Sequence, residues 1–196
     1  MRKPSHHRRT AAAGMVLLLT LSFPAASRAE EVPVPVNLQA EMLFMIAGHD
    51  RNLPARGGSE VRTLILTKAS DDSTRAAAQF KAAAAAKAVV AGLPHQVEVA
   101  AYTSAAALAE AVKAKKLAIV YLTPGFTAAE TAAIGQALEG GNVLTVTATP
   151  AMVKKGVVLG FDLVSGRAKI LVDLTQAAKQ RVSFDPEVLG LMAVSQ

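Results

Sequence analysis

Residues 117–130 read Leu-Ala-Ile-Val-Tyr-Leu-Thr-Pro-Gly-Phe-Thr-Ala-Ala-Glu, and this stretch decides the fold class. Its first six residues are an unbroken apolar run, which is typical of a strand buried on both faces of a parallel sheet. Thr127 and Glu130 then have the spacing of a capping box, which predicts the start of a helix. A buried strand, a short loop and a capped helix together indicate one half of a strand-helix-strand unit.

The same alternation extends in both directions along the chain. Strands are predicted at residues 61–67, 96–102, 117–122 and 142–147. Helices are predicted at residues 73–91, 104–116, 127–140 and 150–156. Because helices between parallel strands form right-handed crossovers, the sequence predicts an α/β fold with a doubly wound, mostly parallel sheet and helices on both faces.

The last quarter of the chain predicts an antiparallel β-hairpin. Segments 157–164 and 167–174 flank Ser165-Gly166, a pair suited to a two-residue turn. In that register Asp162 faces Lys169, and these two are expected to form an ion pair on the solvated face. The other face is entirely apolar, so a slip of one residue would bury charge and the pattern fixes the pairing.

Three other segments complete the expected organisation. A helix is predicted at residues 37–47, where apolar residues recur at helical spacing, and residues 51–60 are expected to form a loop. Two helices, at residues 175–180 and 185–193, are predicted to end the chain.

The first 29 residues have the pattern of a secretory signal peptide. A basic start is followed by an apolar run at residues 11–21 and by small residues up to Ala29, after which we expect cleavage. The apolar run is shorter than the roughly 20 residues of a membrane span, so an integral membrane protein is not expected. We therefore expect a periplasmic protein, with residues 30–36 as an extended linker and residues 37–196 as a single domain.

The charge balance excludes one class of partner. The chain carries a net charge of +6, but five of its 21 basic residues lie in the expected signal peptide, so the remainder is almost neutral. It also has two Tyr, six Phe and no Trp, too few aromatic residues for base stacking. No nucleic-acid partner is expected. The absence of cysteine means that no disulfide stabilises the exported chain.

Patterns that indicate catalysis are sparse. The sequence has no Gly-x-Ser-x-Gly motif and no glycine-rich phosphate-binding motif. His49 and Asp50 could supply two metal ligands, and Asp71-Asp72 could act as a carboxylate pair. Helix-terminal roles explain these residues more simply. We therefore expect no catalytic residues, no cofactor and no resident metal, and the protein is not expected to be an enzyme.

One sheet edge is the expected place for a ligand or partner. In doubly wound folds, ligands bind beside the carboxyl ends of the strands and the N-termini of the following helices. The candidate residues at this edge are Lys68, Ser70, Thr123, Gly125, Phe126 and Thr149.

Residues 160–194 resemble the C-terminal part of the YfiR/HmsC family of periplasmic proteins. In that family a strand, a turn with a basic residue and a second strand precede an alanine-containing helix and a final leucine-rich motif. Asp173 stands where the family usually has Asn, Ala177-Ala178 match the helix, and Leu189 begins the final motif. Upstream, residues 118–122 and 143–147 are similar to two family strands in the same order.

The resemblance implies a regulatory function. YfiR-like proteins bind the periplasmic sensor domain of an inner-membrane diguanylate cyclase and hold it inactive, which links the envelope to cyclic-di-GMP and biofilm formation. Two departures bear on the partner: the chain has no cysteine for redox sensing, and Leu53-Pro54 stands where the family has Trp-Pro. A histidine kinase is thus an alternative partner, and a second copy of the chain is a further one.

A different class of function stays open beside the regulator. The protein could instead be a small-molecule-binding module, similar to one lobe of a periplasmic binding protein, with the ligand held by the loops at the strand ends. A hydrolase ranks third, because the sequence offers no pair of nucleophile and base.

Overall fold

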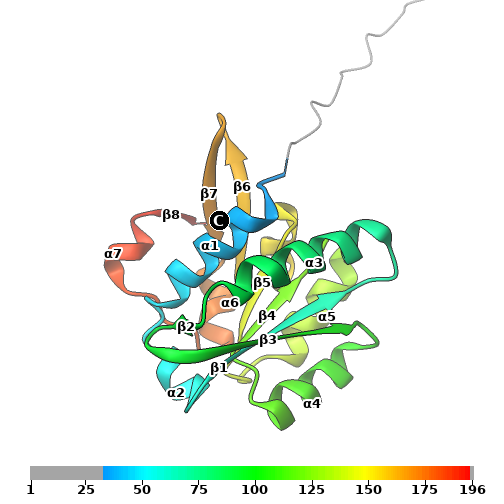
Figure 1. The fold of residues 1–196 in the computed structure, drawn as a ribbon, viewed down its shortest axis with the longest axis horizontal. Helices are drawn as coiled ribbons and strands as arrows, with labels where there is room; N and C mark the ends of the chain where they lie inside the picture. The colour runs from blue at the N-terminus through cyan, green and yellow to red at the C-terminus, as the bar shows by residue number, and fades with distance from the viewer. Residues whose placement is uncertain (1–32, 195–196) are drawn as a thin grey trace, which may run out of the picture. The chain divides into compact units, whose positions relative to one another are not determined.

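The computed structural model describes residues 33–194, so the predicted signal peptide and its cleavage site lie outside the described residues. The described part contains an eight-stranded sheet of order β2-β3-β1-β4-β5-β6-β7-β8 (Figure 1). The strands are β1 (Val61–Thr67), β2 (Val89–Val90), β3 (Leu93–Ala101), β4 (Ile119–Leu122), β5 (Leu144–Thr147), β6 (Leu159–Val164), β7 (Arg167–Val172) and β8 (Met192–Val194).

Five neighbouring strands, β3, β1, β4, β5 and β6, are mutually parallel. Strand β3, which follows β1 in the parallel series, lies on one side of β1. Strands β4, β5 and β6 follow in order on the other side of β1. The direction of winding therefore reverses between β1 and β4, which is the switch point of a doubly wound sheet. The apolar strand β4 lies in the middle of the sheet, as its sequence predicts.

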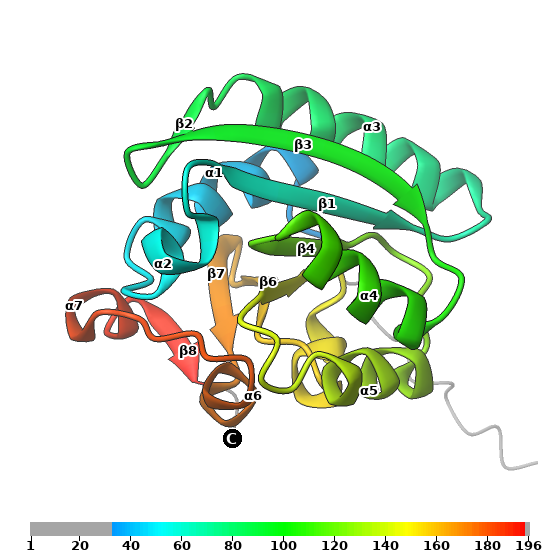
Figure 2. The same cartoon turned by 90° about the horizontal axis from the view of Figure 1, so that it is seen from below.

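Helices cover both faces of the sheet (Figure 2). The helices are α1 (Val36–Ala47), α2 (Leu53–Gly57), α3 (Asp71–Ala85), α4 (Ala105–Lys115), α5 (Ala128–Ala137), the 3-10 helix η1 (Pro150–Lys155), α6 (Leu174–Lys179) and α7 (Pro186–Leu189). Helices α1 and α3 pack on one face, where Leu43 and Phe80 join the same core as Tyr121. Helices α4 and α5 pack on the other face, where Leu108 and Ile134 join the core of Val120.

The C-terminal hairpin has the predicted register. Val164 pairs with Arg167, and Asp162 pairs with Lys169 in an antiparallel ladder. The prediction that Asp162 and Lys169 form an ion pair is wrong. Among the salt bridges of residues 33–194, none joins the Lys169 nitrogen to an Asp162 carboxylate oxygen within 4.0 Å. The Asp162 carboxylate instead accepts a hydrogen bond from the backbone N–H of Leu163.

The predicted helix at residues 73–91 is too long. Helix α3 ends at Ala85, and the β-branched pair Val89-Val90 forms the short strand β2. Strand β2 folds back on Leu93 and Pro94. Ala91 and Gly92 both have positive φ, so Gly92 lies in a tight hairpin turn and does not end a helix. Strand β3 consequently begins three residues earlier than predicted.

Three further boundaries differ from the prediction. The expected loop 51–60 contains the short helix α2. The expected helix at residues 185–193 is reduced to α7, because Met192 enters β8 and pairs with Ile170 of β7. In the expected linker, Val36 begins α1 and Val34 is packed in the core. Each difference arises from tertiary packing, which supplies a partner that the local sequence does not reveal.

Candidate functional site

The sheet topology places the loops after β1, β4 and β5 at one edge, because the three strands are parallel. All six predicted site residues lie in these loops: Lys68 and Ser70 follow β1, Thr123, Gly125 and Phe126 follow β4, and Thr149 follows β5. The structure divides them into two groups. Five surround the switch point between β1 and β4, while Thr149 faces a pocket farther along the edge.

The switch point is closed by a pair of buried hydroxyl groups. The Oγ atom of Ser73 lies 2.6 Å from Oγ1 of Thr123, which also donates to the carbonyl of Leu66 at 3.0 Å. Ser73 lies in the first turn of α3 because Ser70 caps that helix by accepting from the Ser73 N–H. Both hydroxyl groups are buried, and each is satisfied by the protein itself.

A charged pair closes the outer side of the same region. Nζ of Lys68 donates to Oε1 of Glu130 at 2.5 Å, and the other carboxylate oxygen accepts from the backbone of Thr127 in the predicted capping box. The hydrogen bond from Lys68 is the main cause that lowers the pKa of Glu130, and the bond from the Thr127 backbone adds to it. The Lys68 ammonium also lies 5.2 Å from the ring centre of Tyr102 and 5.6 Å from that of Phe126.

Gly125 is required by the backbone of the loop after β4, because its φ of +103° is one that residues with a side chain rarely adopt. A Cβ atom there would make only an ordinary contact, 3.6 Å from Cβ of Lys68. Phe126 is buried and meets Tyr102 edge to face at a centroid distance of 5.2 Å. We call Lys68, Ser73, Thr123 and Glu130 the closed cluster, since their polar groups bind one another.

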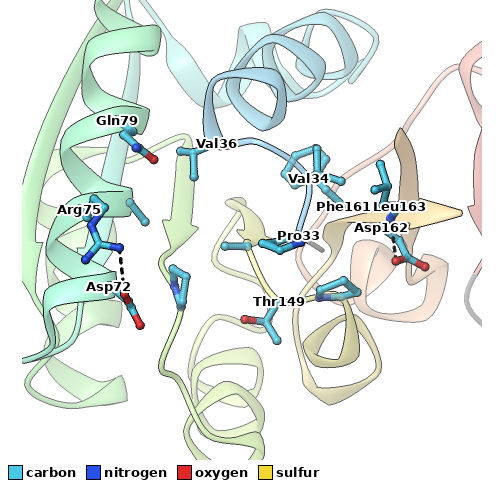
Figure 3. A pocket seen from close by; sticks show the side chains of 14 residues that line it. Pro33, Val34, Val36, Asp72, Arg75, Gln79, Thr149, Phe161, Asp162 and Leu163 are labelled. Carbon is cyan, nitrogen blue, oxygen red and sulfur yellow. Dashed lines mark hydrogen bonds and ion pairs between the residues drawn. The ribbon is translucent and has the colours of Figure 1, made fainter. Parts of the chain in front are cut away.

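A pocket lies between α3 and β6 at the same edge (Figure 3). Its volume is about 520 Å³, within the range that holds small organic ligands. Val34, Ala148 and Phe161 give it apolar walls, and Thr149 and Pro150 lie where β5 ends. The segment Pro33–Val36 crosses one side, as Figure 3 shows.

The rim of the pocket carries charge. Asp72 and Arg75 on α3 form an exposed ion pair at 3.2 Å, and Gln79 lies one turn farther along the helix. Asp162 of β6 lies on the opposite side of the pocket (Figure 3). None of these four residues is among the six predicted from the sequence to line this edge, and Asp72 was considered only as part of a carboxylate pair with Asp71. Helical spacing indicates that Asp72, Arg75 and Gln79 share one face of α3, but no local pattern indicates that β6 lies opposite.

The two histidines among residues 33–194 both contact other residues of the protein. His95 bonds through its ring to Oγ1 of Thr63 at 2.9 Å and to the carbonyl of Lys87, and burial lowers its pKa. This hydroxyl–imidazole pair resembles a nucleophile with its base, but Thr63 is 0% exposed and cannot meet a substrate. His49 approaches Asp185 at 3.7 Å.

Asp50 forms a buried ion pair with Arg56 instead of joining His49 as a metal ligand. Nη2 of Arg56 lies 2.7 Å from Oδ2 of Asp50, and burial is the main cause that lowers the pKa of the guanidinium. Residues 33–194 contain no cluster of three or more His, Cys, Asp or Glu side chains that could hold a metal ion. In the same range, no helix combines the length and apolarity that a membrane crossing requires.

Several solved structures share this fold at low sequence identity. The ABC domain in complex with L-Trp from Streptococcus pneumonia matches 82% of the chain with a TM-score of 0.56 and 16% identity. A conserved domain protein from Vibrio cholerae matches 85% of the chain, with a TM-score of 0.57 and 14% sequence identity. The ligand-free, open structure of the substrate binding protein CD0873 from Clostridium difficile matches 83% of the chain, with a TM-score of 0.60 and 11% sequence identity. The alignments span 61%, 61% and 60% of those chains, so the likeness concerns the α/β fold of a part of each.

A comparison with curated proteins gave no match. A family model described as YfiR/HmsC-like matches residues 37–192, from the first turn of α1 to β8. The match includes the hairpin, α6 and the final segment that carry the resemblance in the sequence, and it supports a periplasmic regulator as the general class of function. The chain belongs to the YfiR/HmsC-like family.

Proposed function

We propose that this protein is a periplasmic, non-enzymatic regulator that binds the extracytoplasmic domain of an inner-membrane signalling protein of the diguanylate-cyclase type. Membership of the YfiR/HmsC-like family is the observation that carries the proposal. Through this contact the protein would control cyclic-di-GMP and biofilm formation.

The carboxyl edge of the sheet offers a suitable contact surface. An interface needs an apolar centre with a polar rim, and the pocket has apolar walls within a rim that contains Asp72, Arg75 and Asp162. Beside it, the β6–β7 hairpin extends to an exposed tip at Ser165-Gly166, with Val164 39% exposed (Figure 1). We propose that the sensor domain docks here.

The closed cluster supports a non-enzymatic role. Ser73 and Thr123 are buried and hydrogen-bonded to each other, so neither hydroxyl is free to attack a substrate. The Lys68 ammonium is engaged by Glu130, and it is therefore not available as a free amine. A chromogenic ester or phosphate substrate turned over by the purified protein, with the activity lost in Thr123→Val, would contradict this part of the proposal.

Binding to a membrane sensor can be tested with a charge reversal on α3. The protein purified after export is immobilised and offered the detergent-solubilised envelope of its own host, and retained proteins are identified by mass spectrometry. We expect a cyclase with an extracytoplasmic domain to be retained and its cyclase activity to fall when the protein is added. Arg75→Glu should weaken retention, whereas Lys81→Glu, farther along the same helix and outside the pocket, should not.

Two results would overturn the proposal. One is that the folded protein retains no membrane sensor, cyclase or kinase. The other is that a retained cyclase keeps its full activity in the presence of saturating protein. If a histidine kinase is retained in place of a cyclase, the proposed regulatory role stands but the proposed class of partner is wrong.

Export is a separate expectation with its own measurement. If the signal peptide is cleaved after Ala29, the mass of the protein recovered from the periplasmic fraction corresponds to a chain beginning at Glu30. Recovery of the protein only in the cytoplasm would contradict the periplasmic location.

The pocket favours a second candidate function, a small-molecule-binding module. Its volume and apolar walls suit a compact ligand with a polar end, and one structure of similar fold is described in complex with L-Trp. A thermal-shift screen of amino acids and small aromatic metabolites tests this function. We expect any true ligand to raise Tm in the wild type and to lose most of that shift in Gln79→Ala, while Lys81→Ala keeps it.

A further inference from the structure

His95 is the first residue of β3 that pairs with β1, and its ring connects several elements. Its Nδ1 atom lies 2.9 Å from the carbonyl oxygen of Lys87, in the segment after α3. Its Nε2 atom lies 2.9 Å from Oγ1 of Thr63 on β1. The ring of Phe44 on α1 meets the imidazole edge to face at a centroid distance of 4.7 Å. One side chain of β3 thus contacts β1, α1 and the segment that follows α3.

These contacts determine which nitrogen of the neutral ring carries the proton. A carbonyl oxygen only accepts hydrogen bonds, so Nδ1 carries the proton and donates to Lys87. Nε2 is then without a proton, and it accepts from the hydroxyl group of Thr63. Thr63 is buried, and within residues 33–194 its hydroxyl group bonds only to His95. In the neutral form, both ring nitrogens and the buried hydroxyl group are therefore satisfied.

A second proton on the ring would disturb this arrangement. Nε2 would become a donor, so the hydroxyl proton of Thr63 would lose its acceptor inside the protein, which is costly. Burial is the main cause that lowers the pKa of His95 below its ordinary value of 6.5, while the carbonyl groups of Lys87 and Ala84 act in the opposite direction. The folded protein thus favours the neutral ring, and acid acts against the contacts that this ring makes.

No neighbouring ion pair compensates a charge on His95. On the two strands, Arg62 pairs with Glu60, and Glu98 pairs with Lys115. The other charged side chains on the packed elements are exposed, and within residues 33–194 none forms an ion pair with His95: Glu41 on α1, Asp71, Asp72, Arg75 and Lys81 on α3, and Lys87 after it. Burial and hydrogen bonds therefore decide the protonation of this ring.

The segment that His95 holds has few other contacts. Residues 85–92 connect the end of α3 to β3 and include the short strand β2 (Figure 2). All of them are exposed except Val90. Apart from the pairing of β2, the segment is joined to β3 by two bonds of His95, from its backbone N–H to Ala88 and from its ring to Lys87. Segments with so little buried surface open at low cost in free energy.

We propose that His95 is an acid-sensitive latch for residues 85–92. The neutral ring holds this segment against β1 and β3. When the ring gains a second proton, it leaves Thr63 and Lys87, and the segment opens while the central strands of the sheet stay paired. The surface at the end of α3 then depends on the acidity around the protein. This latch is a property of the folded chain alone and goes beyond the proposed contact with a sensor.

The direction of the effect follows from the linkage between protonation and opening. The pKa of His95 is lowered in the closed form, so the open form binds the proton more readily. The stability that the latch contributes is complete above the ordinary pKa of 6.5, and it decreases as the pH falls below 6.5 toward the lower pKa of the closed form.

Hydrogen exchange measured by mass spectrometry on the exported protein tests the latch. Between pH 7 and pH 5.5, after correction for the intrinsic exchange rates, protection of residues 85–95 should fall by about three- to tenfold, and protection of β4 should not change. His95→Gln keeps an uncharged acceptor near Thr63 and cannot gain a proton in this range, so it should lose the pH dependence. The matched control, His49→Gln, removes the other described histidine and should keep it.

A second measurement needs only the wild type. In nuclear magnetic resonance spectra of the exported protein, the nitrogen shifts of His95 at pH 7 should show a proton on Nδ1 and none on Nε2. Its ring should titrate below pH 6.5. The signal that is missing in His95→Gln identifies the ring. This titration decides the question if His95→Gln proves to be open already at pH 7.

Each outcome supports or overturns the latch. A loss of protection confined to residues 85–95, absent from His95→Gln and kept in His49→Gln, would establish it. Unchanged protection in the wild type, an equal loss in His95→Gln, or a His95 ring that titrates at or above pH 6.5 would overturn it. The measurements stop at pH 5.5, above the ordinary pKa of Glu130, so its titration does not interfere. None of these results depends on the identity of the membrane partner.

Discussion

The carboxyl edge of the sheet contains two regions of similar origin and opposite character. At the switch point, the polar groups of Lys68, Ser73, Thr123 and Glu130 bind one another. Between α3 and β6, the loops leave a pocket of about 520 Å³ whose rim charges are exposed. Both regions follow parallel strands and adjoin the first turn of a helix.

The difference between them lies in how the polar groups are satisfied. A buried polar group must find a partner, and in the closed cluster the neighbouring loop supplies it. At the pocket the polar groups are solvated, so they are free to exchange water for a ligand or a partner. Proximity to the strand ends therefore does not by itself make a binding site. Substitutions in the closed cluster should change stability, and substitutions at the pocket should change binding.

The largest effect should come from the buried hydroxyl pair. Thr123→Val removes the hydroxyl that bonds Ser73 and Leu66, and we expect a loss of about 2 kcal/mol in the free energy of unfolding. Urea denaturation measures it. The matched control is Thr149→Val at the pocket, which removes a hydroxyl without a side-chain cap bond and should cost less than about 0.5 kcal/mol. If the two variants lose equal free energy of unfolding, the proposed difference between the closed cluster and the pocket is contradicted.

A smaller effect is expected from the charged pair of the closed cluster. Lys68→Met removes a half-buried ion pair and the contact of an ammonium with two aromatic rings, which should cost about 1 kcal/mol. Arg75→Met removes the exposed pair with Asp72 and should change stability by less than about 0.5 kcal/mol. Chemical denaturation at low and high salt checks both. A greater loss in Arg75→Met than in Lys68→Met would contradict the assignment of these roles.

Acid should weaken the closed cluster through Glu130. Its pKa in the folded protein is lowered, chiefly by Lys68, so the unfolded chain binds the proton more readily. The stability that Glu130 contributes is present above its ordinary pKa of 4.5 and is lost as the pH falls through the folded value. Urea midpoints measured between pH 6 and pH 3 should fall less steeply in Glu130→Gln than in the wild type. The prediction is contradicted if the urea midpoint falls with pH as steeply in Glu130→Gln as in the wild type. Asp72→Asn, which also loses one carboxylate, is the control.

The smallest effect on stability should come from the pocket rim. Gln79 is exposed on α3, so Gln79→Ala should change the free energy of unfolding by no more than about 0.5 kcal/mol. The same variant should weaken binding of whatever occupies the pocket, measured by calorimetry with the sensor domain or a ligand found by thermal shift. A loss of stability above 1 kcal/mol would mean that the rim is structural and that the two regions are alike.

The sequence predicted the parts of the fold in which local pattern and burial agree. The apolar run of β4 implies a central strand, Thr127 and Glu130 form the expected capping box, and the alternation in 157–174 fixes the hairpin register. Prediction from the sequence failed where pairing with another segment determines the secondary structure. Val89-Val90 became a strand because Leu93 and Pro94 fold back on them, and residues 192–194 became a strand because β7 offers an edge.

The candidate site was predicted in part. The loops at Lys68, Thr123 and Thr149 do adjoin one sheet edge, because parallel strands carry their carboxyl ends to the same side. The pocket itself was not predicted. Phe161 and Asp162 belong to a hairpin about ninety residues from α3 in the chain, and no spacing rule connects them to Asp72 and Arg75. Val34, assigned to a linker, is a wall of the pocket for the same reason.

The sequence alone determined the α/β class, the hairpin register, the residues at the carboxyl edge and the resemblance to a family. The first three follow from periodicity and from capping and turn residues, which act within a few residues, and the resemblance rests on the motif residues in 160–194 and on the two strands upstream. Only the tertiary structure decided which polar groups at that edge satisfy each other and where a cavity remains. Those outcomes depend on which strand lies beside which, and hydrogen bonds and packing between distant segments set that order.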